Sequence, residues 1–281
     1  MKEIILSHFQ AQALLNAKNR GLEITQISLD LGINSIQVML EPLGVQLITG
    51  EVLSWEGVKS IADSQSSCFV IENGEAAAIQ FYSEATERLY SLYPTSGAPS
   101  MLISGIPMHR IKETDPHQDT LEKIRTIKPV VGQVLDTATG LGYTAIQAAR
   151  TAEHVTTIEL DPLALQVCRL NPWSQELFDN PKITQLIGDS FEVVAGMESG
   201  CFTRVIHDPP AFSLAGDLYS GEFYVQLHRV MRNQSRLFHY IGDPESKSGR
   251  NITAGVIRRL EQVGFRQVRR APQAFGVVAV K

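Results

Sequence analysis

The chain has 281 residues, enough for one large domain or two of ordinary size. Its 43% hydrophobic and 20% charged residues are typical of a soluble globular protein. The formal net charge of −5 argues against a general nucleic-acid coat protein, although a local basic surface is compatible with it. No apolar run reaches the length of a signal peptide or a membrane span, so we predict a cytoplasmic protein with no membrane partner.

The first part of the chain reads as a small β-rich unit. We predict a helix over residues 1–20, then short β-prone runs divided by glycines, and a second helix over residues 54–64. Asn73-Gly74 lies between two apolar runs and indicates a β-hairpin. The pattern predicts an α+β N-terminal domain over residues 1–105. It contains no catalytic constellation, and we expect it to shape a substrate, hold the partner of a homodimer or cover the active site.

A turn-rich segment over residues 93–100 separates this half from the next. Asp119 and Thr120 then open a predicted amphipathic helix over residues 121–127, with Asp119 as its N-cap. These two residues could cap the helix or contact a ligand, and both roles remain open. Ligand contact is an alternative because the helix directly precedes the strand that leads into a glycine-rich turn.

Strands and helices alternate strictly from Val130 onward. The last two strands, at residues 265–270 and 275–280, are separated by a gap too short for a crossover helix. They should pair antiparallel, while the earlier strands, joined by helices, should be parallel. Residues 106–281 are therefore predicted to form a doubly wound, seven-stranded, mostly parallel α/β sheet that ends in an antiparallel hairpin.

Four acidic residues mark the ends of four predicted strands: Asp136, Glu159, Asp189 and Asp208. Each alone is explained as a turn or cap residue. Ligands of doubly wound sheets bind at the carboxyl ends of the strands, so the four together predict one binding site.

The turn after the first of these strands contains Asp136, Gly140 and Gly142. Ala145 stands where a dinucleotide fingerprint would have its third glycine, and a carboxylate beside the turn would repel a pyrophosphate but suit a cation. The Asp-x-x-x-Gly-x-Gly pattern resembles the first motif of class I S-adenosylmethionine-dependent methyltransferases.

With S-adenosylmethionine as cofactor, each acid has a role. Glu159 would accept both ribose hydroxyls, Asp189 the adenine amine beside Ser190, and Asp136 would face the amino group and the sulfonium. The predicted cofactor-binding residues are Asp119, Thr120, Asp136, Thr137, Ala138, Gly140, Gly142, Tyr143, Glu159, Leu160, Asp189, Ser190 and Asp208.

Asp208-Pro209-Pro210-Ala211-Phe212 predicts a rigid ledge, because proline fixes its own backbone angle and lacks an N–H. It resembles the Asp/Asn-Pro-Pro-aromatic motif of methyltransferases that act on nitrogen, except that Ala211 displaces the aromatic residue. The predicted catalytic residues are Asp208, Pro209, Pro210, Phe212 and Tyr219. The neighbouring His207, and His239 further on, are interpreted as structural.

Cys68, Cys168 and Cys201 are far apart and form no Cys-x-x-Cys motif, so we interpret them as reduced thiols. None lies in a motif suited to methylation of carbon through cysteine. This leaves nitrogen as the expected acceptor atom.

Across residues 106–281 the chain resembles a group of predicted archaeal-type class I methyltransferases. The segments that carry the resemblance are residues 108–110, 119–120, 136–143, 171–174, 207–216 and 238–243. The resemblance implies an S-adenosylmethionine-dependent methyltransferase (EC 2.1.1) that needs no metal and methylates an amine, amide or base nitrogen by in-line transfer. RNA, a small amine and a protein remain open as acceptors, with a late cluster of arginines offering an RNA contact: Arg258, Arg259, Arg266, Arg269 and Arg270.

Two alternatives remain. The sheet is similar to that of spermidine synthases, which transfer an aminopropyl group from decarboxylated S-adenosylmethionine, although their Gly-Gly-Gly-Asp-Gly-Gly run is absent here. The other alternative is a non-catalytic scaffold that binds the cofactor.

Overall fold

The computed structural model describes residues 3–212 and 214–281. The chain forms two compact units. The first contains residues 1–117 and 163–175, and the second contains residues 118–162 and 176–281. The predicted domain boundary at residue 105 stays a prediction.

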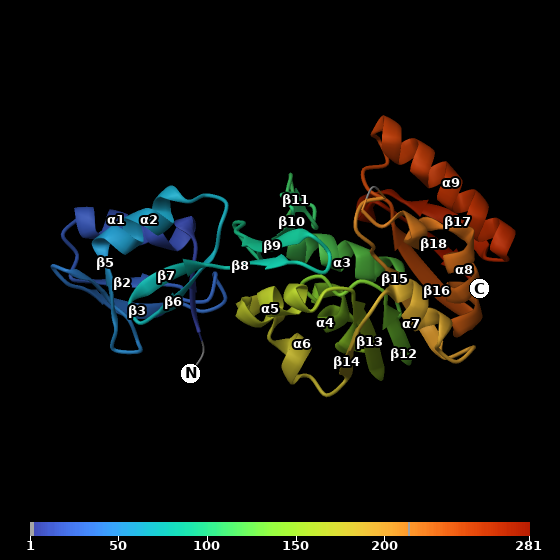
Figure 1. Ribbon diagram of the computed structural model, residues 1–281, viewed down its shortest axis with the longest axis horizontal. Helices are drawn as coiled ribbons and strands as arrows, with labels where there is room; N and C mark the ends of the chain where they lie inside the picture. Colours follow the sequence, from blue (N-terminus) through green and yellow to red (C-terminus); the bar gives the residue numbers. More distant parts are fainter. Residues whose placement is uncertain (1–2, 213) are drawn as a thin grey trace. The chain divides into compact units, whose positions relative to one another are not determined.

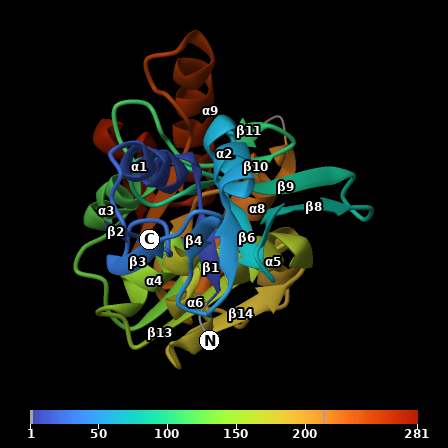
Figure 2. The same cartoon turned by 90° about the vertical axis from the view of Figure 1, so that its left-hand side faces the viewer.

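The first unit contains three small antiparallel sheets, with strand orders β1-β6-β7, β2-β3-β4-β5 and β11-β10-β9-β8. Its elements are β1 (Ile4–Leu6), α1 (His8–Asn19), β2 (Ile24–Ile27), β3 (Ile36–Leu40), β4 (Gly44–Gln46), β5 (Val52–Ser54), α2 (Trp55–Asp63), β6 (Phe69–Glu72), β7 (Glu75–Ala78), β8 (Gln80–Ser83), β9 (Arg88–Tyr93), β10 (Ser100–Ile103) and β11 (Ile106–Pro107). Helices α1 and α2 pack side by side (Figures 1 and 2).

The β-rich character and the hairpin at Asn73-Gly74 are confirmed, since β6 and β7 pair antiparallel on either side of that turn. The expected helix over residues 1–20 is wrong at its start. Ile4, Ile5 and Leu6 are all buried and pair with β6 as a strand. Helix α1 begins only after Ser7, whose backbone N–H donates to the Gln10 side chain at 3.0 Å. Burial of three consecutive apolar residues against a neighbouring strand therefore overrides the helical pattern.

The second unit is built on one seven-stranded sheet of order β14-β13-β12-β15-β16-β18-β17. The chain elements from Pro116 onward are α3 (Pro116–Thr126), β12 (Gln133–Asp136), α4 (Tyr143–Ala149), β13 (His154–Glu159), α5 (Pro162–Leu170), η1 (Pro172–Ser174), α6 (Glu176–Asp179), β14 (Ile183–Ile187), α7 (Ser190–Ala195), β15 (Phe202–His207), η2 (Gly216–Tyr219), α8 (Gly221–Val230), β16 (Met231–Tyr240), α9 (Lys247–Val263), β17 (Arg266–Ala271), η3 (Pro272–Ala274) and β18 (Gly276–Val280). The predicted sheet is confirmed: β12 to β16 pair parallel, and β18 pairs antiparallel with both β16 and β17.

Strand order reverses between β12 and β15, because the chain proceeds outward from β12 to β14 and then returns to β15. Helices α3 and α4 lie on one face of the sheet, and α7, α8 and α9 on the other (Figure 1). The chain therefore leaves β12 and β15 toward opposite faces of the sheet, and doubly wound sheets bind their ligands at such a point. Below this edge, Leu135, Val205, Phe223 and Leu237 belong to one continuous buried core.

Asp119 is not the N-cap of α3. The helix begins at Pro116, where the Asp115 side chain accepts the backbone N–H of His117 at 2.8 Å. Asp119 lies inside the helix, one turn before Lys123, and both side chains are buried. The helix begins earlier than predicted because proline suits a first helical turn and an acidic residue precedes it.

Within the described residues the three cysteines form no disulfide; Cys68 and Cys168 are buried and Cys201 is partly buried. Among the described residues, none of the helices has the length and apolarity needed to cross a membrane.

Candidate functional site

The structure places the four predicted strand-end acids along one edge of the sheet. Asp136 ends β12 and Glu159 ends β13, while Asp189 and Asp208 lie just beyond β14 and β15. These four strands are neighbours and all run parallel, so their carboxyl ends share one edge. The edge includes the point where strand order reverses, which is where open α/β sheets bind ligands.

The glycine turn after β12 leaves its backbone accessible. Gly140 and Gly142 have φ values of 52° and 75°, in the left-handed region that disfavours other residues. A Cβ atom on Gly140 would meet nothing within 4 Å, whereas one on Gly142 would lie 2.8 Å from the Leu177 side chain. Gly142 therefore packs α4 against α6, and Gly140 leaves open space for a ligand.

Glu159 ties the neighbouring strand to this turn. Its Oε2 accepts the N–H of Gly140 at 2.9 Å and its Oε1 accepts the N–H of Asp161 at 3.2 Å. The backbone of Leu160 also hydrogen-bonds this carboxylate. A carboxylate has about four lone-pair positions, so Glu159 retains capacity to accept a ribose hydroxyl. Burial raises the pKa of Glu159 to about 7 in spite of these hydrogen bonds.

Apolar surface lies next to this acid. Leu160 and Ile187, at the ends of β13 and β14, are 47% and 50% exposed. Large exposed apolar side chains at a strand edge suit the face of a flat ring. Asp189 caps α7 by accepting the N–H of Phe191, and the residue is exposed. This group therefore fits a nucleoside.

The hydroxyl of Ser190 donates to the Thr137 carbonyl at 2.5 Å, which joins the α7 terminus to the glycine turn. Ser190, Thr137 and Tyr143 are buried, and Ala138 is partly buried. These predicted cofactor residues thus shape the turn, since the side chains of Ser190, Thr137 and Tyr143 are buried.

Asp136 is fully buried, and its Oδ2 accepts the hydroxyls of Thr144 at 2.9 Å and Thr157 at 3.2 Å. Its other oxygen, Oδ1, is also buried and has no hydrogen-bond partner among the described residues. Burial raises its pKa to about 7; the Thr144 hydroxyl opposes this shift, and the charge of Asp208 adds to it. Asp136 thus has one oxygen that two threonine hydroxyls satisfy and one buried oxygen at the switch point, where a nearby cationic group would be favourable.

We predict a pH-dependent stability from Asp136. Because the folded pKa of about 7 lies above the ordinary value of 3.8, its contribution to stability is complete below pH 3.8 and is lost as pH rises through 7. Asparagine does not titrate, so Asp136→Asn should not lose this stability as pH rises. The free energy of unfolding of the variant, minus that of the parent protein, should therefore increase by about 2 kcal/mol from about pH 5 to about pH 8. Urea unfolding across this range measures the difference. A gap between the two proteins that does not change with pH would contradict the prediction.

A buried ion-pair cluster links α3 to the end of β15. The Lys123 ammonium lies 2.8 Å from Asp119 Oδ2 and 2.6 Å from Asp208 Oδ2. It also lies over the ring of Tyr240, 4.7 Å from the centroid. The side chains of Lys123 and Asp119 are 1% and 0% exposed, and that of Asp208 is 16% exposed. Burial alone would lower the pKa of Lys123, but the charges of Asp208 and Asp119 raise it, so the lysine stays protonated.

Sequence reasoning missed Lys123. The available signal was its spacing of four from Asp119, on the same helical face as the apolar Ile124 and Ile127. Its pairing with Asp208, 85 positions away, has no counterpart in local sequence. Thr120, beside Asp119, is also buried.

The ledge after β15 is held by Tyr219. The Tyr219 hydroxyl donates to the Pro210 carbonyl at 3.1 Å, and its ring meets Phe212 edge to face, with centroids 5.3 Å apart. Tyr219 and Pro209 are buried, while Phe212 is 51% exposed. The structure therefore brings Asp208, the prolines and both aromatic residues together, with Phe212 presented to the surface.

His207 connects this ledge to the glycine turn. Its Nε2 donates to the Leu218 carbonyl at 2.8 Å, so its Nδ1 accepts the Thr137 hydroxyl at 2.7 Å. Burial lowers the pKa of His207 to about 4, in spite of the bond to Leu218, and keeps it neutral. His239 is also buried, and burial and its neighbour His207 lower its pKa. These contacts agree with the structural interpretation of both histidines.

No family model matches the chain. Among solved structures, it is similar to a spermidine synthase in complex with the transition-state analogue AdoDATO. The TM-score is 0.59 at 17% identity, over 74% of this chain and 76% of that one. The spermidine synthase of Thermotoga maritima gives 0.57 at 16% identity, over 74% and 75%. The chain therefore has the class I, Rossmann-like fold shared by spermidine synthases and S-adenosylmethionine-dependent methyltransferases.

The chain is 45% identical over 233 residues to the uncharacterized protein MJ1233 of Methanocaldococcus jannaschii, covering 82% of this chain and 78% of that protein. It belongs to the same family as MJ1233. Two further relatives are similar over shorter segments. A polyamine aminopropyltransferase of Sulfurisphaera tokodaii is 30% identical over 87 residues, and putrescine N-methyltransferase 4 of Nicotiana tabacum is 26% identical over 104 residues. These matches cover 30% and 36% of this chain, and 29% and 27% of the relatives.

Proposed function

We propose that this protein is an S-adenosylmethionine-dependent methyltransferase that acts on a nitrogen atom of its acceptor. One observation carries the proposal: Lys123 fixes the partly exposed Asp208 carboxylate beside the Pro-Pro ledge, at the switch point of the sheet. Asp136, Glu159 and the open face of Gly140 lie along the same edge and would hold the cofactor. The fold and the relatives support this assignment.

When bound, S-adenosylmethionine supplies an electrophilic methyl group on a sulfonium. The protein has to align the acceptor nitrogen in line with that group and exclude water. Asp208, whose side chain is partly exposed, would accept an N–H of the acceptor, while Lys123 keeps the carboxylate ionised and oriented. The Pro209 and Pro210 carbonyls would accept further N–H groups, and Phe212 would pack on the acceptor. Asp208 would thereby direct the acceptor's nitrogen lone pair toward the methyl group, and the proton that the product nitrogen loses would pass to solvent.

Aminopropyl transfer is the second candidate. Two similar structures are spermidine synthases, and one relative is a polyamine aminopropyltransferase. The relative named putrescine N-methyltransferase supports methyl transfer equally. Its name also indicates an amine nitrogen as the acceptor of that enzyme. The two reactions differ in the cofactor, so the cofactor decides between them.

Calorimetric titration with S-adenosylmethionine and with its decarboxylated form tests the proposal. We expect S-adenosylmethionine to bind more tightly, because a methyltransferase site must hold the carboxylate that the other form lacks. Gly140→Ala should weaken binding by about tenfold or more, since its methyl group would enter the space left for the ligand. Tight binding of the decarboxylated form alone would overturn methyl transfer in favour of aminopropyl transfer.

Gly105→Ala is the matched control for this variant. Gly105 also has a positive φ, 83°, and a Cβ atom there would likewise meet nothing within 4 Å. It shares the backbone strain of Gly140→Ala but lies outside the predicted cofactor site, so its affinity should equal that of the parent protein. Incorporation of a tritiated methyl group into RNA, protein and small-molecule fractions would then identify the acceptor class.

A further inference from the structure

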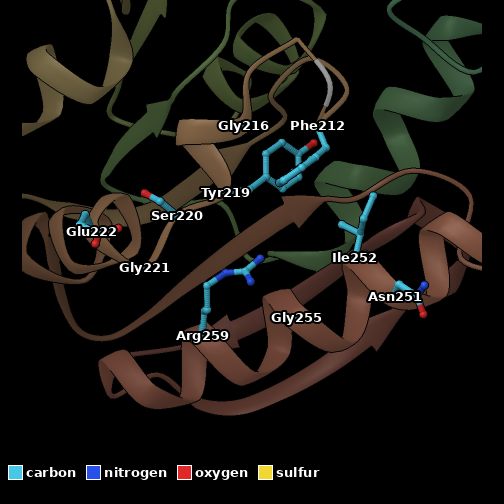
Figure 3. A pocket seen from close by; sticks show the side chains of 10 residues that line it. All are labelled: Phe212, Gly216, Tyr219, Ser220, Gly221, Glu222, Asn251, Ile252, Gly255 and Arg259. Atoms are coloured by element: carbon cyan, nitrogen blue, oxygen red, sulfur yellow. The ribbon is translucent and has the colours of Figure 1, made fainter.

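A pocket of 490 Å³ lies beside the Pro-Pro ledge, between the segment that follows it and helix α9 (Figure 3). Phe212 and Tyr219 form one wall, the start of α8 forms another, and Ile252, Gly255 and Arg259 of α9 form the floor. The pocket thus shares two residues with the predicted acceptor site and extends away from it.

Arg259 is the one cationic side chain that lines this pocket, and in Figure 3 its guanidinium points from α9 toward Tyr219. It forms no ion pair with the described part of the chain, and its Nε is buried without a hydrogen-bond partner there. The guanidinium does hydrogen-bond the Tyr224 hydroxyl, which lies in the core. Arg259 as a whole is half-buried, so its guanidinium is accessible from the pocket, and an anionic ligand there would supply a partner for the buried Nε.

The glycines of the pocket keep space around this guanidinium. A Cβ atom on Gly255 would lie 3.1 Å from Nη1 of Arg259, one helical turn further on. Cβ atoms on Gly216 or Gly221 would meet nothing within 4 Å, which shows that the opposite wall is open. The arginine can therefore present its N–H groups to the cavity.

The opposite wall also carries positive potential. Helix α8 runs from Gly221 to Val230, and its first turn borders the pocket, where unpaired backbone N–H groups concentrate. The hydroxyl of Ser220 accepts one of them, from Phe223. Glu222, an exposed carboxylate in that turn, also lines the pocket and would oppose an anion at the rim. Arg259 and the start of α8 thus favour an oxyanion in the interior.

We propose that this pocket binds an oxyanion, a carboxylate or a phosphate, carried by the acceptor substrate. This inference rests on the proposed function and adds a chemical feature of the acceptor. The acceptor would offer its nitrogen at Asp208 and its anionic group at Arg259. Guanidinium pairs with both groups through two parallel hydrogen bonds. The aromatic wall of Phe212 and Tyr219 suits a ring or an apolar spacer between the two ends.

Calorimetric titration with benzoate, phenyl phosphate and benzamide tests the pocket without a known substrate and without turnover. Benzamide matches benzoate in size but lacks the charge. We expect at least one anion to bind about tenfold or more tightly than benzamide, as charge-assisted hydrogen bonds imply. Preference for benzoate assigns a carboxylate, and preference for phenyl phosphate assigns a phosphate. Equal binding of all three compounds would overturn the proposal.

Two variants localise the effect. Arg259→Gln should abolish the preference for anions, while thermal unfolding reports whether loss of the Tyr224 contact disturbs the fold. Gly255→Ala should weaken anion binding by crowding the guanidinium, yet it should not lower thermal stability, because alanine favours a helix interior over glycine. Unchanged anion affinity in both variants would sink the proposal. Titration with S-adenosylmethionine is independent of this pocket, so failure here and failure of the proposed function are distinguishable.

Discussion

Lys123→Met is expected to lower the free energy of unfolding by about 3 to 5 kcal/mol near neutral pH, because removing one partner of a buried ion pair leaves uncompensated charge. Here two carboxylates, Asp119 and Asp208, would lose their shared cation, and Asp119 has no access to water. Methionine keeps much of the packing volume, so the loss would report charge and not a cavity. Urea unfolding followed by circular dichroism measures it. The deficit should shrink at lower pH as the two carboxylates take up protons.

The matched control is Lys59→Met in the first unit. Lys59 pairs with Asp63 at the same helical spacing and at 2.7 Å, but both side chains are about two-thirds exposed, at 68% and 67%. An exposed pair of this kind contributes about 0.3 to 0.5 kcal/mol, so the variant should be nearly as stable as the parent protein. Equal losses in the two variants would contradict the assignment of a buried, structural charge cluster.

Asp208→Asn should reduce the rate of transfer on the order of 100- to 1,000-fold while leaving the affinity for S-adenosylmethionine unchanged. The amide keeps the shape of the side chain but loses the negative charge that orients an acceptor N–H. Its cost in stability should be smaller than that of Lys123→Met, because Lys123 would keep Asp119 as a partner. Single-turnover transfer of a labelled methyl group measures the rate once the acceptor fraction is known, and calorimetry measures the affinity.

Asp119→Asn provides the comparison, since it removes the other carboxylate from the same lysine. Asp119 is completely buried, whereas Asp208 is partly exposed at the ledge. We therefore expect Asp119→Asn to affect stability but to retain most of the transfer rate. Equal loss of transfer in both variants would argue that Asp208 acts only through Lys123. A loss of cofactor affinity in Asp119→Asn would favour the cofactor role that the sequence predicts for this residue.

Much of the fold could be predicted from local pattern. Helix α5 has a proline in its first turn and strand β14 is a short β-prone run, and both are local signals that the sequence itself shows. The antiparallel end of the sheet also follows from local sequence, since the gap between the last two strands is too short for a crossover helix. The strand-end acids follow from the same reasoning, as each ends a predicted strand or follows it within two residues.

Long-range partners lie beyond such patterns. Strand β1 was expected to be helical, because its three apolar residues become a strand only against β6. The Lys123–Asp208 pair depends on α3 packing beside the end of β15, and residues 85 positions apart give no local signal. The predicted arginine cluster divides for the same reason: Arg259 lines a pocket, whereas Arg258, Arg266, Arg269 and Arg270 are exposed.

Local sequence was sufficient to predict the order of the elements, the mostly parallel sheet and the acids that end its strands, because these depend on residues close together in the chain. How those acids are used depends on the packed fold. In that fold Asp136 is buried among threonine hydroxyls, Glu159 accepts a hydrogen bond from the Gly140 N–H of the glycine turn, and Asp208 pairs with Lys123. The charge and hydrogen bonding of a carboxylate depend on burial and on neighbours brought from elsewhere in the chain, and these exist only once the sheet and its helices have packed.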